Sequence, residues 1–248
     1  MLSKAQIKYI QSLQHKKYRQ KSGQYIAEGD KIVPELLQEG VPVKEVYATT
    51  AWINTHRPLL DRTAGVGVTV VDENMLKQLS ALTTPNQALA LLDIPVAPPV
   101  VPGSLKGTIS LALETIQDPG NLGTIIRIAD WFGIRQLICS PDCVDAYNPK
   151  TIQATMGSIA RVRIIESDIV TFLQQSGMSS YAATLHGSDI TGFSRLEEGI
   201  ILIGNESRGL SDAVIAASTH KITIPRLGGA ESLNAGVAAG IICGRLLI

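Results

Sequence analysis

The sequence has few aromatic residues and no long apolar run. Aromatic residues make up 4% of the 248 positions, although hydrophobic residues make up 45%. The interior must therefore be filled mainly by Ile, Leu, Val and Ala, which is typical of α/β proteins with buried parallel strands. No apolar stretch approaches the roughly 18 residues that a membrane-spanning helix needs, and the first residues lack the apolar core of a signal peptide. We therefore expect a cytoplasmic protein with no membrane partner.

Cysteine is also scarce. The three cysteines, Cys139, Cys143 and Cys243, are odd in number and lack the C-x-x-C spacing of a metal or redox site. We expect reduced thiols, as in a cytoplasmic protein, and no metal ion.

The formal net charge of zero hides a basic N-terminal end. Residues 1–31 carry seven Lys and Arg side chains against only Glu28 and Asp30. A basic end on a neutral protein can bind an RNA backbone without making the whole surface adhesive. A solvated amphipathic helix rich in lysine is the alternative. The candidate RNA-binding residues are Lys4, Lys8, Lys16, Lys17, Arg19 and Lys21.

A proline-rich stretch divides the chain. Four prolines lie between Asp93 and Gly103, and they favour an extended connector because proline fits neither a helix interior nor a central strand. We predict a small α/β domain over residues 1–92, a linker over 93–107 and a second domain over 108–248. In the first domain the pattern predicts helices at 4–14, at 30–38 and after the N-cap candidate Asp72, and strands at 25–29, 43–48 and 66–71.

Strands and helices alternate in the second domain. This alternation predicts a parallel sheet with helices on both faces, in which ligands bind beyond the carboxyl ends of the strands. Strands are predicted at 108–113, 135–140, 162–166, 181–185, 199–204 and 221–225, and helices at 122–132, 149–159, 168–176, 211–218 and 233–247.

Three loops at such strand ends carry polar residues, and we name them by order. The first loop, residues 114–127, places Pro119, Gly120 and Gly123 in a tight turn before a helix. Asn121 stands where an N-cap would, and Arg127 follows about two turns later. A capped helix with a surface arginine is the structural alternative. A dinucleotide site is disfavoured because the G-x-G-x-x-G fingerprint is missing.

The second loop, residues 204–210, follows an entirely apolar strand and contains Glu206 and Arg208. A structural ion pair between these two residues is the alternative to a functional site. The third loop, residues 224–234, leads through Gly228 and Gly229 to Ser232 and Asn234 at the start of the last helix. Ser232 is the expected N-cap, and a helix N-terminus suits an anion.

Taken together and in this order, the GNLGTIIR, IGNESRGL and IPRLGGAESLN segments resemble the three motifs of the SpoU family of RNA 2′-O-ribose methyltransferases, in the SPOUT class. The resemblance covers residues 108–248. Residues 1–92 resemble the small, ribosomal-protein-like RNA-binding domain that precedes the catalytic domain in several members. The resemblance implies a deep C-terminal trefoil knot, a homodimer, and S-adenosylmethionine (AdoMet) as the cofactor.

The resemblance also implies the site residues. The reacting centre would contain Arg127, Asn121, Glu206, Ser232 and Asn234. On matching positions, the cofactor would contact Gly204, Ile224 and Leu233, and the further cofactor candidates in or beside the same loops are Ile203, Asn205 and Leu227. Leu185, His186 and Gly187, with Thr184 beside them, are added as candidates for the entrance of the cofactor site because of their location alone, at the end of another strand. The family's proposed base is Arg127. Because arginine stays protonated, we favour a different role for it, in which the guanidinium binds a phosphate and polarises the ribose hydroxyl.

The resemblance favours ribosomal RNA as the substrate because the first domain resembles a ribosomal protein. A tRNA ribose methyltransferase of the same family and a non-catalytic RNA-binding relative are the alternatives. A relative without catalysis would be expected to have damaged motifs, whereas Asn121, Arg127, Glu206 and Asn234 are all present.

Overall fold

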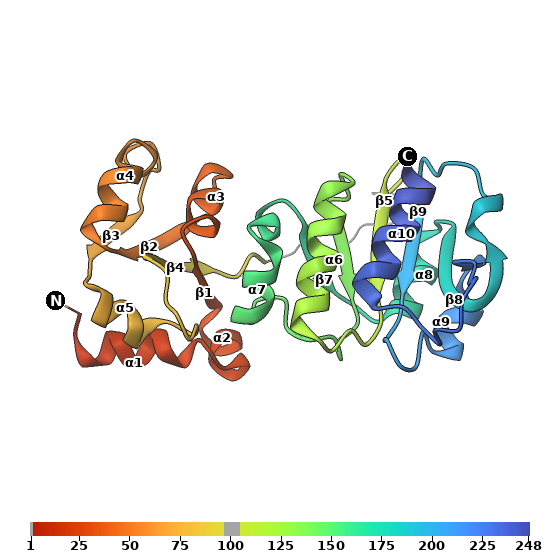
Figure 1. The fold of residues 1–248 in the computed structure, drawn as a ribbon, viewed down its shortest axis with the longest axis horizontal. Coiled ribbons are helices and arrows are strands. Elements are labelled where there is room, and N and C mark those ends of the chain that lie inside the picture. The colour runs from red at the N-terminus through yellow and green to blue at the C-terminus, as the bar shows by residue number, and fades with distance from the viewer. Residues whose placement is uncertain (1, 97–104) are drawn as a thin grey trace. The chain divides into compact units, whose positions relative to one another are not determined.

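The computed structural model describes residues 2–96 and 105–248, and these residues form two compact units (Figure 1). The N-terminal unit contains Met1–Val96 together with Asp145–Ala160. The C-terminal unit contains Ala97–Val144 together with Arg161–Ile248. Most of the predicted linker, residues 97–104, lies outside the described residues.

The N-terminal unit is built on a four-stranded sheet of order β1-β4-β2-β3. Strand β4 is antiparallel to both of its neighbours, and β2 and β3 are parallel. The elements are α1 (Lys4–Ser12), α2 (Lys16–Ser22), β1 (Gln24–Glu28), α3 (Ile32–Gln38), β2 (Val43–Ala48), α4 (Thr50–Leu60), β3 (Gly67–Val70), α5 (Glu73–Leu79) and β4 (Ala88–Asp93).

Local signals explain several of these boundaries. Ser3 caps α1 in a reciprocal capping box with Gln6, and Asp72 caps α5 by accepting a hydrogen bond from the Met75 N–H at 2.7 Å, as predicted. We did not predict α2, α4 or β4. The last of these includes Asp93, opposite Gln24 of β1, so ordered structure continues into the predicted linker.

Residues 145–160, which we expected in the second domain, pack with the N-terminal residues. They contain α7 (Pro149–Thr155) and the short 3-10 helix η1 (Ser158–Ala160), where we predicted one continuous helix. The helix breaks because Met156 adopts the left-handed conformation. The Tyr147 ring lies 4.9 Å from that of Tyr25, and the Gln153 amide donates to the Glu28 carbonyl at 2.6 Å.

A buried ion pair fastens this segment. The Arg19 side chain is only 1% exposed and donates from Nη2 to the Asp145 carboxylate at 2.5 Å and from Nη1 to the Leu13 carbonyl at 2.8 Å. Burying a guanidinium is tolerable only when its charge is paired and its N–H groups are bonded. Arg19 therefore joins α2 to a segment that follows it by more than a hundred residues.

The C-terminal unit is a six-stranded sheet of order β10-β8-β9-β5-β6-β7 in which every pair of neighbours is parallel. The predicted parallel sheet is confirmed. Its elements are β5 (Ile109–Leu113), α6 (Pro119–Trp131), β6 (Gln136–Cys139), β7 (Arg163–Glu166), α8 (Ile169–Ser176), β8 (Ser180–Asp189), the 3-10 helix η2 (Ile190–Gly192), β9 (Gly199–Ile203), α9 (Asp212–Ala217), β10 (His220–Thr223) and α10 (Ala235–Leu247).

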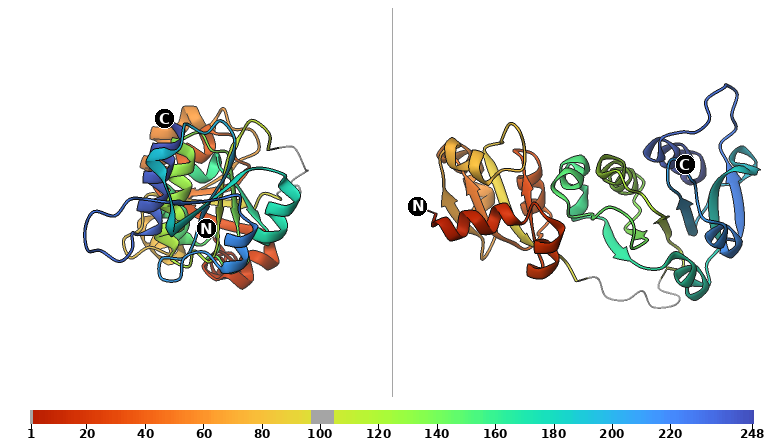
Figure 2. Two further views of the ribbon diagram at one scale, coloured as in Figure 1. Left: turned by 90° about the vertical axis from the view of Figure 1, so that its right-hand side faces the viewer. Right: turned by 90° about the horizontal axis from the view of Figure 1, so that it is seen from below.

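Helices cover both faces of this sheet. Figures 1 and 2 show α6 and α10 side by side on one face, and α8 and α9 on the other. Between the sheet and the second helix pair lies a core that includes Ile138, Phe172, Leu202 and Val214. Leu105 is buried in the same core, so the predicted linker also ends earlier than expected.

The Arg19–Asp145 pair predicts a specific loss of stability. Asp145→Ala leaves the buried guanidinium without its counter-charge and should lower the free energy of unfolding by about 3–5 kcal/mol. Urea unfolding, followed by circular dichroism, measures this change.

The matched control is Lys44→Ala, which breaks the exposed Lys44–Asp93 pair, whose side chains are 51% and 45% exposed. It should cost less than about 1 kcal/mol because solvent screens exposed pairs. An equal decrease in the free energy of unfolding of the two variants would show that the buried pair stabilises the protein no more than the exposed pair does.

Candidate active site at the carboxyl ends of the parallel strands

The first loop turns sharply from β5 into α6. Asp118 is the N-cap, since its carboxylate accepts a hydrogen bond from the Asn121 N–H at 2.7 Å, and Pro119 opens the helix. We expected Asn121 itself at the cap, and that prediction was wrong. As the third residue of α6, Asn121 has a side chain that is free to reach the other loops.

The second loop folds back on itself. Asn205 and Gly209 exchange two backbone hydrogen bonds, of 3.1 and 2.9 Å. A Cβ atom on Gly204 would lie 2.3 Å from the backbone of Gly209, so only glycine fits at position 204. The Asn205 side chain accepts from the N–H groups of Ser207 and Arg208 and donates to the Thr115 carbonyl at 2.9 Å.

The third loop projects from the unit between β10 and α10, as both views in Figure 2 show. Asn234 is the N-cap of α10, because its side-chain oxygen accepts hydrogen bonds from the N–H groups of Gly236 and Val237 at 2.9 and 3.2 Å. Ser232, which we predicted as the cap, lies exposed in the loop. Asparagine at the cap satisfies two N–H groups that would otherwise lack acceptors.

Side-chain hydrogen bonds join the three loops. Asn121 donates from Nδ2 to Oε1 of Glu206 at 2.6 Å. Asn234 donates from Nδ2 to Oδ1 of Asn121 at 2.8 Å. Residues separated by 85 and 113 positions in the sequence therefore meet at one edge of the sheet. Glu206 engages Asn121 and forms no ion pair with Arg208 among the described residues, so the structural ion pair considered above is not found.

Arg127 lies exposed on α6, six residues after Asn121. At 3.6 residues per turn, the two side chains point about 120° apart around the helix axis. Across residues 2–96 and 105–248, no hydrogen bond or ion pair is recorded for the Arg127 guanidinium. Glu206 does not hold it, and the guanidinium remains available to bind an anion.

Strand β8 bulges where three predicted cofactor residues lie. Ala182 pairs with Lys221 of β10, and Ser188 pairs with the next residue, Ile222. The intervening residues, 183–187, form the bulge and include Leu185, His186 and Gly187. A Cβ atom on Gly187 would lie 2.6 Å from the backbone of Lys221, so glycine is required for the two strands to approach so closely.

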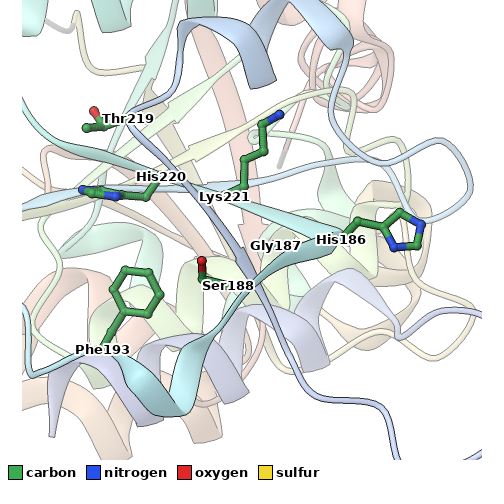
Figure 3. A pocket seen from close by; sticks show the side chains of 7 residues that line it. All are labelled: His186, Gly187, Ser188, Phe193, Thr219, His220 and Lys221. Atoms are coloured by element: carbon green, nitrogen blue, oxygen red, sulfur yellow. The ribbon is translucent and has the colours of Figure 1, made fainter.

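A pocket of about 470 Å³ lies beside this bulge (Figure 3). The His220 and Phe193 rings lie at one end of it, with centroids 6.0 Å apart, and His186 lies at the other. The pocket is lined by His186, Gly187, Ser188, Phe193, Thr219, His220 and Lys221.

The other predicted cofactor residues differ in exposure. Ile203 is buried in β9, and the side chain of Asn205 is occupied by hydrogen bonds within the loops, so neither side chain lines the pocket. Leu185, Leu227 and Leu233 are exposed apolar side chains near the loops, with Leu227 fully exposed. Ile224 is partly exposed at the start of the third loop.

The predicted RNA-binding set divides in two. The lysines Lys4, Lys8, Lys16, Lys17 and Lys21 are exposed on α1 and α2. Arg19 is buried in its pair with Asp145, so its assignment as a phosphate ligand was wrong. Arg19 stands among other basic residues, and nothing in the local sequence indicates that it pairs with the distant Asp145.

Two residues that we did not single out also hold the first loop. Ser140 and Asp142 follow β6 and hydrogen-bond to Thr115. The pKa of the Asp142 carboxyl lies below its ordinary value because the hydroxyls of Ser140 and Thr115 donate to it, the Ser140 bond having the larger effect. The available signal was their position directly after a strand of the same parallel sheet.

All three cysteines are buried and none forms a disulfide. Hydrogen bonds from Cys139 and Ser140 lower the pKa of the Cys143 thiol to about 7. Within the described ranges no three His, Cys, Asp or Glu side chains cluster as metal ligands would. No helix among those residues is long and apolar enough to cross a membrane.

The chain matches two protein-family models. Residues 108–244 match the SpoU rRNA Methylase family, and residues 4–90 match the MRM3-like substrate binding domain. Among curated proteins, the chain is 28% identical to the 23S rRNA guanosine 2′-O-methyltransferase RlmP of Bacillus subtilis, over 95% of this chain and 93% of that protein.

Solved structures agree along the whole chain. A protein from Porphyromonas gingivalis, assigned to the TrmH family of RNA methyltransferases, is 34% identical over 100% of this chain and 98% of its own, with a TM-score of 0.86. An AdoMet-bound rRNA methyltransferase from Sinorhizobium meliloti is 27% identical over 99% and 96%, with a TM-score of 0.86. These matches and the joined loops lead to one conclusion: the chain belongs to the SpoU rRNA methylase family.

Proposed function

We propose that the protein is an AdoMet-dependent methyltransferase that modifies a ribose 2′-hydroxyl in ribosomal RNA. The observation that carries this proposal is the hydrogen-bonded chain Asn234–Asn121–Glu206, which joins the three family loops at one edge of the sheet. Family membership and the named activities of the relatives, RlmP among them, support it. Incubation with labelled AdoMet and total RNA, followed by mapping of the labelled ribose, tests it directly and separates rRNA from tRNA.

The residues at the site fit AdoMet. Gly187 lines the pocket and has no side chain, so main-chain groups are accessible there, and backbone N–H and C=O groups suit an adenosine with its amino-acid tail. Leu227 and Leu233 present exposed apolar surface above this edge. We propose that they cover the cofactor, with Ile224 beside them.

For methyl transfer the protein must mainly orient the ribose hydroxyl and allow its proton to leave. The bound AdoMet supplies an electrophilic methyl group, so the chain must hold the ribose oxygen in line with it. The free guanidinium of Arg127 binds the phosphate beside the target ribose and polarises its hydroxyl, whose proton leaves to water late in the transfer. Asn121, Glu206 and Asn234 fix the three loops relative to one another at the carboxyl edge of the sheet, and Ser232 lies in the exposed third loop.

The N-terminal unit supplies RNA affinity. No acidic residue precedes Glu28 in the sequence, so the exposed lysines of α1 and α2 face no nearby counter-charge on these helices. Tyr18 is exposed among Lys16, Lys17 and Lys21 and offers an aromatic ring for stacking on an unpaired base. The match of residues 4–90 to a substrate binding domain supports this division between residues 1–92 and 108–248.

We also propose a homodimer formed through α6 and α10. Trp131 is 84% exposed, and Val237 and Ile241 of α10 are 50% and 40% exposed. The two helices pack side by side, and large exposed apolar side chains on neighbouring helices favour an interface. Arg127 lies one turn before Trp131 on α6, which places the reacting centre beside the two-fold contact.

A trefoil knot is part of the proposal. After β10, at the sheet edge beside β8, the chain returns to α10, which packs on α6. The close approach of Gly187 to Lys221, beside the register shift between β8 and β10, leaves these strands tightly packed where the segment would be threaded. The unpaired cysteines support a cytoplasmic location.

Arg127→Ala should abolish methyl transfer without affecting the cofactor. Loss of the group that polarises the hydroxyl should lower kcat by about 100-fold or more, while the Kd for AdoMet, measured by calorimetry, stays within about twofold. The control is Arg135→Ala, an exposed arginine before β6 at the opposite edge of the sheet. Near-normal turnover of Arg127→Ala would refute its role.

The triple substitution Lys16→Ala, Lys17→Ala and Lys21→Ala should weaken RNA binding. If all three contact phosphates, the slope of log Kd against log salt should fall by about 2–3, because each contact contributes about 0.7–0.9. Filter binding at several salt concentrations measures the slope, and AdoMet binding should not change. Lys106→Ala, an exposed lysine of the C-terminal unit, is the control. An unchanged slope in the triple variant would show that these three lysines do not contact RNA phosphates.

Val237→Asp with Ile241→Asp should convert the dimer into monomers, because it places charges in an apolar contact. Sedimentation velocity measures the mass. The control is Val70→Asp, which changes a valine that is 61% exposed in the N-terminal unit. A monomeric wild-type protein, or a dimer that survives the double substitution, would contradict the proposed interface.

A further inference from the structure

Thr115 holds an unfavourable backbone conformation at the start of the first loop. Its φ is +57°, and only Thr115 and Met156 among the described non-glycine residues have a positive φ. A β-branched residue is strongly disfavoured there, since its side chain crowds the backbone. Such a conformation persists only where the surrounding structure imposes it, and it is most common at functional sites.

Three hydrogen bonds to three separate positions impose this conformation. The Thr115 N–H donates to Oγ of Ser140 at 2.9 Å. Its Oγ1 donates to Oδ2 of Asp142 at 2.5 Å. Its carbonyl accepts from Nδ2 of Asn205 at 2.9 Å. Every polar group of Thr115 is therefore bonded to a neighbouring loop.

The contact with Asn205 gives the first and second loops a second junction. The side-chain junction is Asn121 with Glu206, and the backbone junction is Thr115 with Asn205. Two junctions fix the relative orientation of two loops, whereas one would allow rotation about it. Between them, Ile116 is buried and its N–H donates to Sγ of Cys143 at 3.3 Å.

We propose that Thr115 is a positioning residue for methyl transfer, and that its hydroxyl, held by Asp142, fixes the first loop against the second loop in the reactive arrangement. This inference rests on the proposed function. The hydroxyl holds the residue in a conformation that turns its carbonyl toward Asn205. Thr115 acts without touching cofactor or RNA, and its effect reaches the reacting centre through α6, which carries Asn121 and Arg127.

Three substitutions at Thr115 separate its hydroxyl from its backbone conformation. Thr115→Val keeps the shape and removes the hydroxyl, and kcat should fall about tenfold or more because small displacements at a reacting centre are costly. Thr115→Ser keeps the hydroxyl and should restore kcat to within about threefold of wild type. Thr115→Gly accepts the positive φ without strain but lacks the hydroxyl, so it should fold normally and still lose turnover.

Thr171→Val is the matched control. The Thr171 hydroxyl also hydrogen-bonds to an aspartate, Asp168, but at the N-terminus of α8, away from the three loops. Its removal should leave kcat within about twofold of wild type. The Kd for AdoMet should stay within about twofold in all four variants, so that the loss appears in kcat and not in cofactor binding.

Hydrogen–deuterium exchange supplies a readout that does not depend on catalysis. Thr115→Val should speed exchange in peptides covering 114–121 and 204–210, and Thr171→Val should not. Normal turnover by Thr115→Val, full activity of Thr115→Gly, failure of Thr115→Ser to restore kcat, or unchanged exchange in both peptides would overturn the inference. If the wild-type protein methylates no RNA while the exchange result holds, the proposed function fails but the junction between the loops does not.

Discussion

The side-chain amide of Asn121 is the contact on which the geometry of the site depends. It donates to Glu206 and accepts from Asn234 at the same time, which only a group with both a donor and an acceptor can do. Aspartate at this position would offer no donor to Glu206 and would add a second negative charge beside it. The amide therefore joins the Glu206 carboxylate to the capping amide of Asn234 without adding a second charge, and it brings together segments from three parts of the sequence.

Close backbone packing brings the amide within reach of its partners. Asp118 takes the capping role at the start of α6, which leaves the Asn121 side chain available. Gly236 allows α10 to approach α6, because a Cβ atom there would lie only 3.0 Å from Cγ2 of Thr124. Glycine weakens a helix, and here that cost is offset by the approach of Asn234 to Asn121. A larger residue at position 236 would require Thr124 to move and would strain the contact between the loops.

The sequence was informative wherever the pattern was local. Alternating apolar strands and helices predicted the parallel sheet, and the rule that ligands bind at carboxyl strand ends directed attention to the three loops that the structure joins. The caps were harder to predict, since Asp118 and Asn121 are both good capping residues, as are Ser232 and Asn234. Only the direction in which the chain enters each helix decides between such pairs, and tertiary packing sets that direction.

Other features depended on contacts that no local pattern records. Helix α2 consists almost wholly of polar residues and has no apolar periodicity. Its one buried residue is Arg19, so the contact that holds the helix against the unit is the ion pair with Asp145, far along the chain. Residues 145–160 are likewise far from the N-terminal residues in the sequence, so no local pattern predicted that they pack with the N-terminal unit. Thr115 gave no signal either, because a positive φ is expected from glycine or asparagine and not from threonine. Its conformation follows from Ser140, Asp142 and Asn205, which come from two later loops.

The buried arginine also decides which way the basic helix faces. A helix of seven residues is too short to be stable alone, and a side chain fixed in the interior sets its rotation. With Arg19 turned inward, Lys16, Lys17, Tyr18 and Lys21 all lie exposed. An arginine at the surface would have added one more exposed positive charge but would have left the helix without a side chain fixed in the interior. The Arg19–Asp145 pair thus orients the remaining basic side chains of α2 toward solvent, and the proposed RNA contact would depend on an ion pair that does not itself touch the RNA.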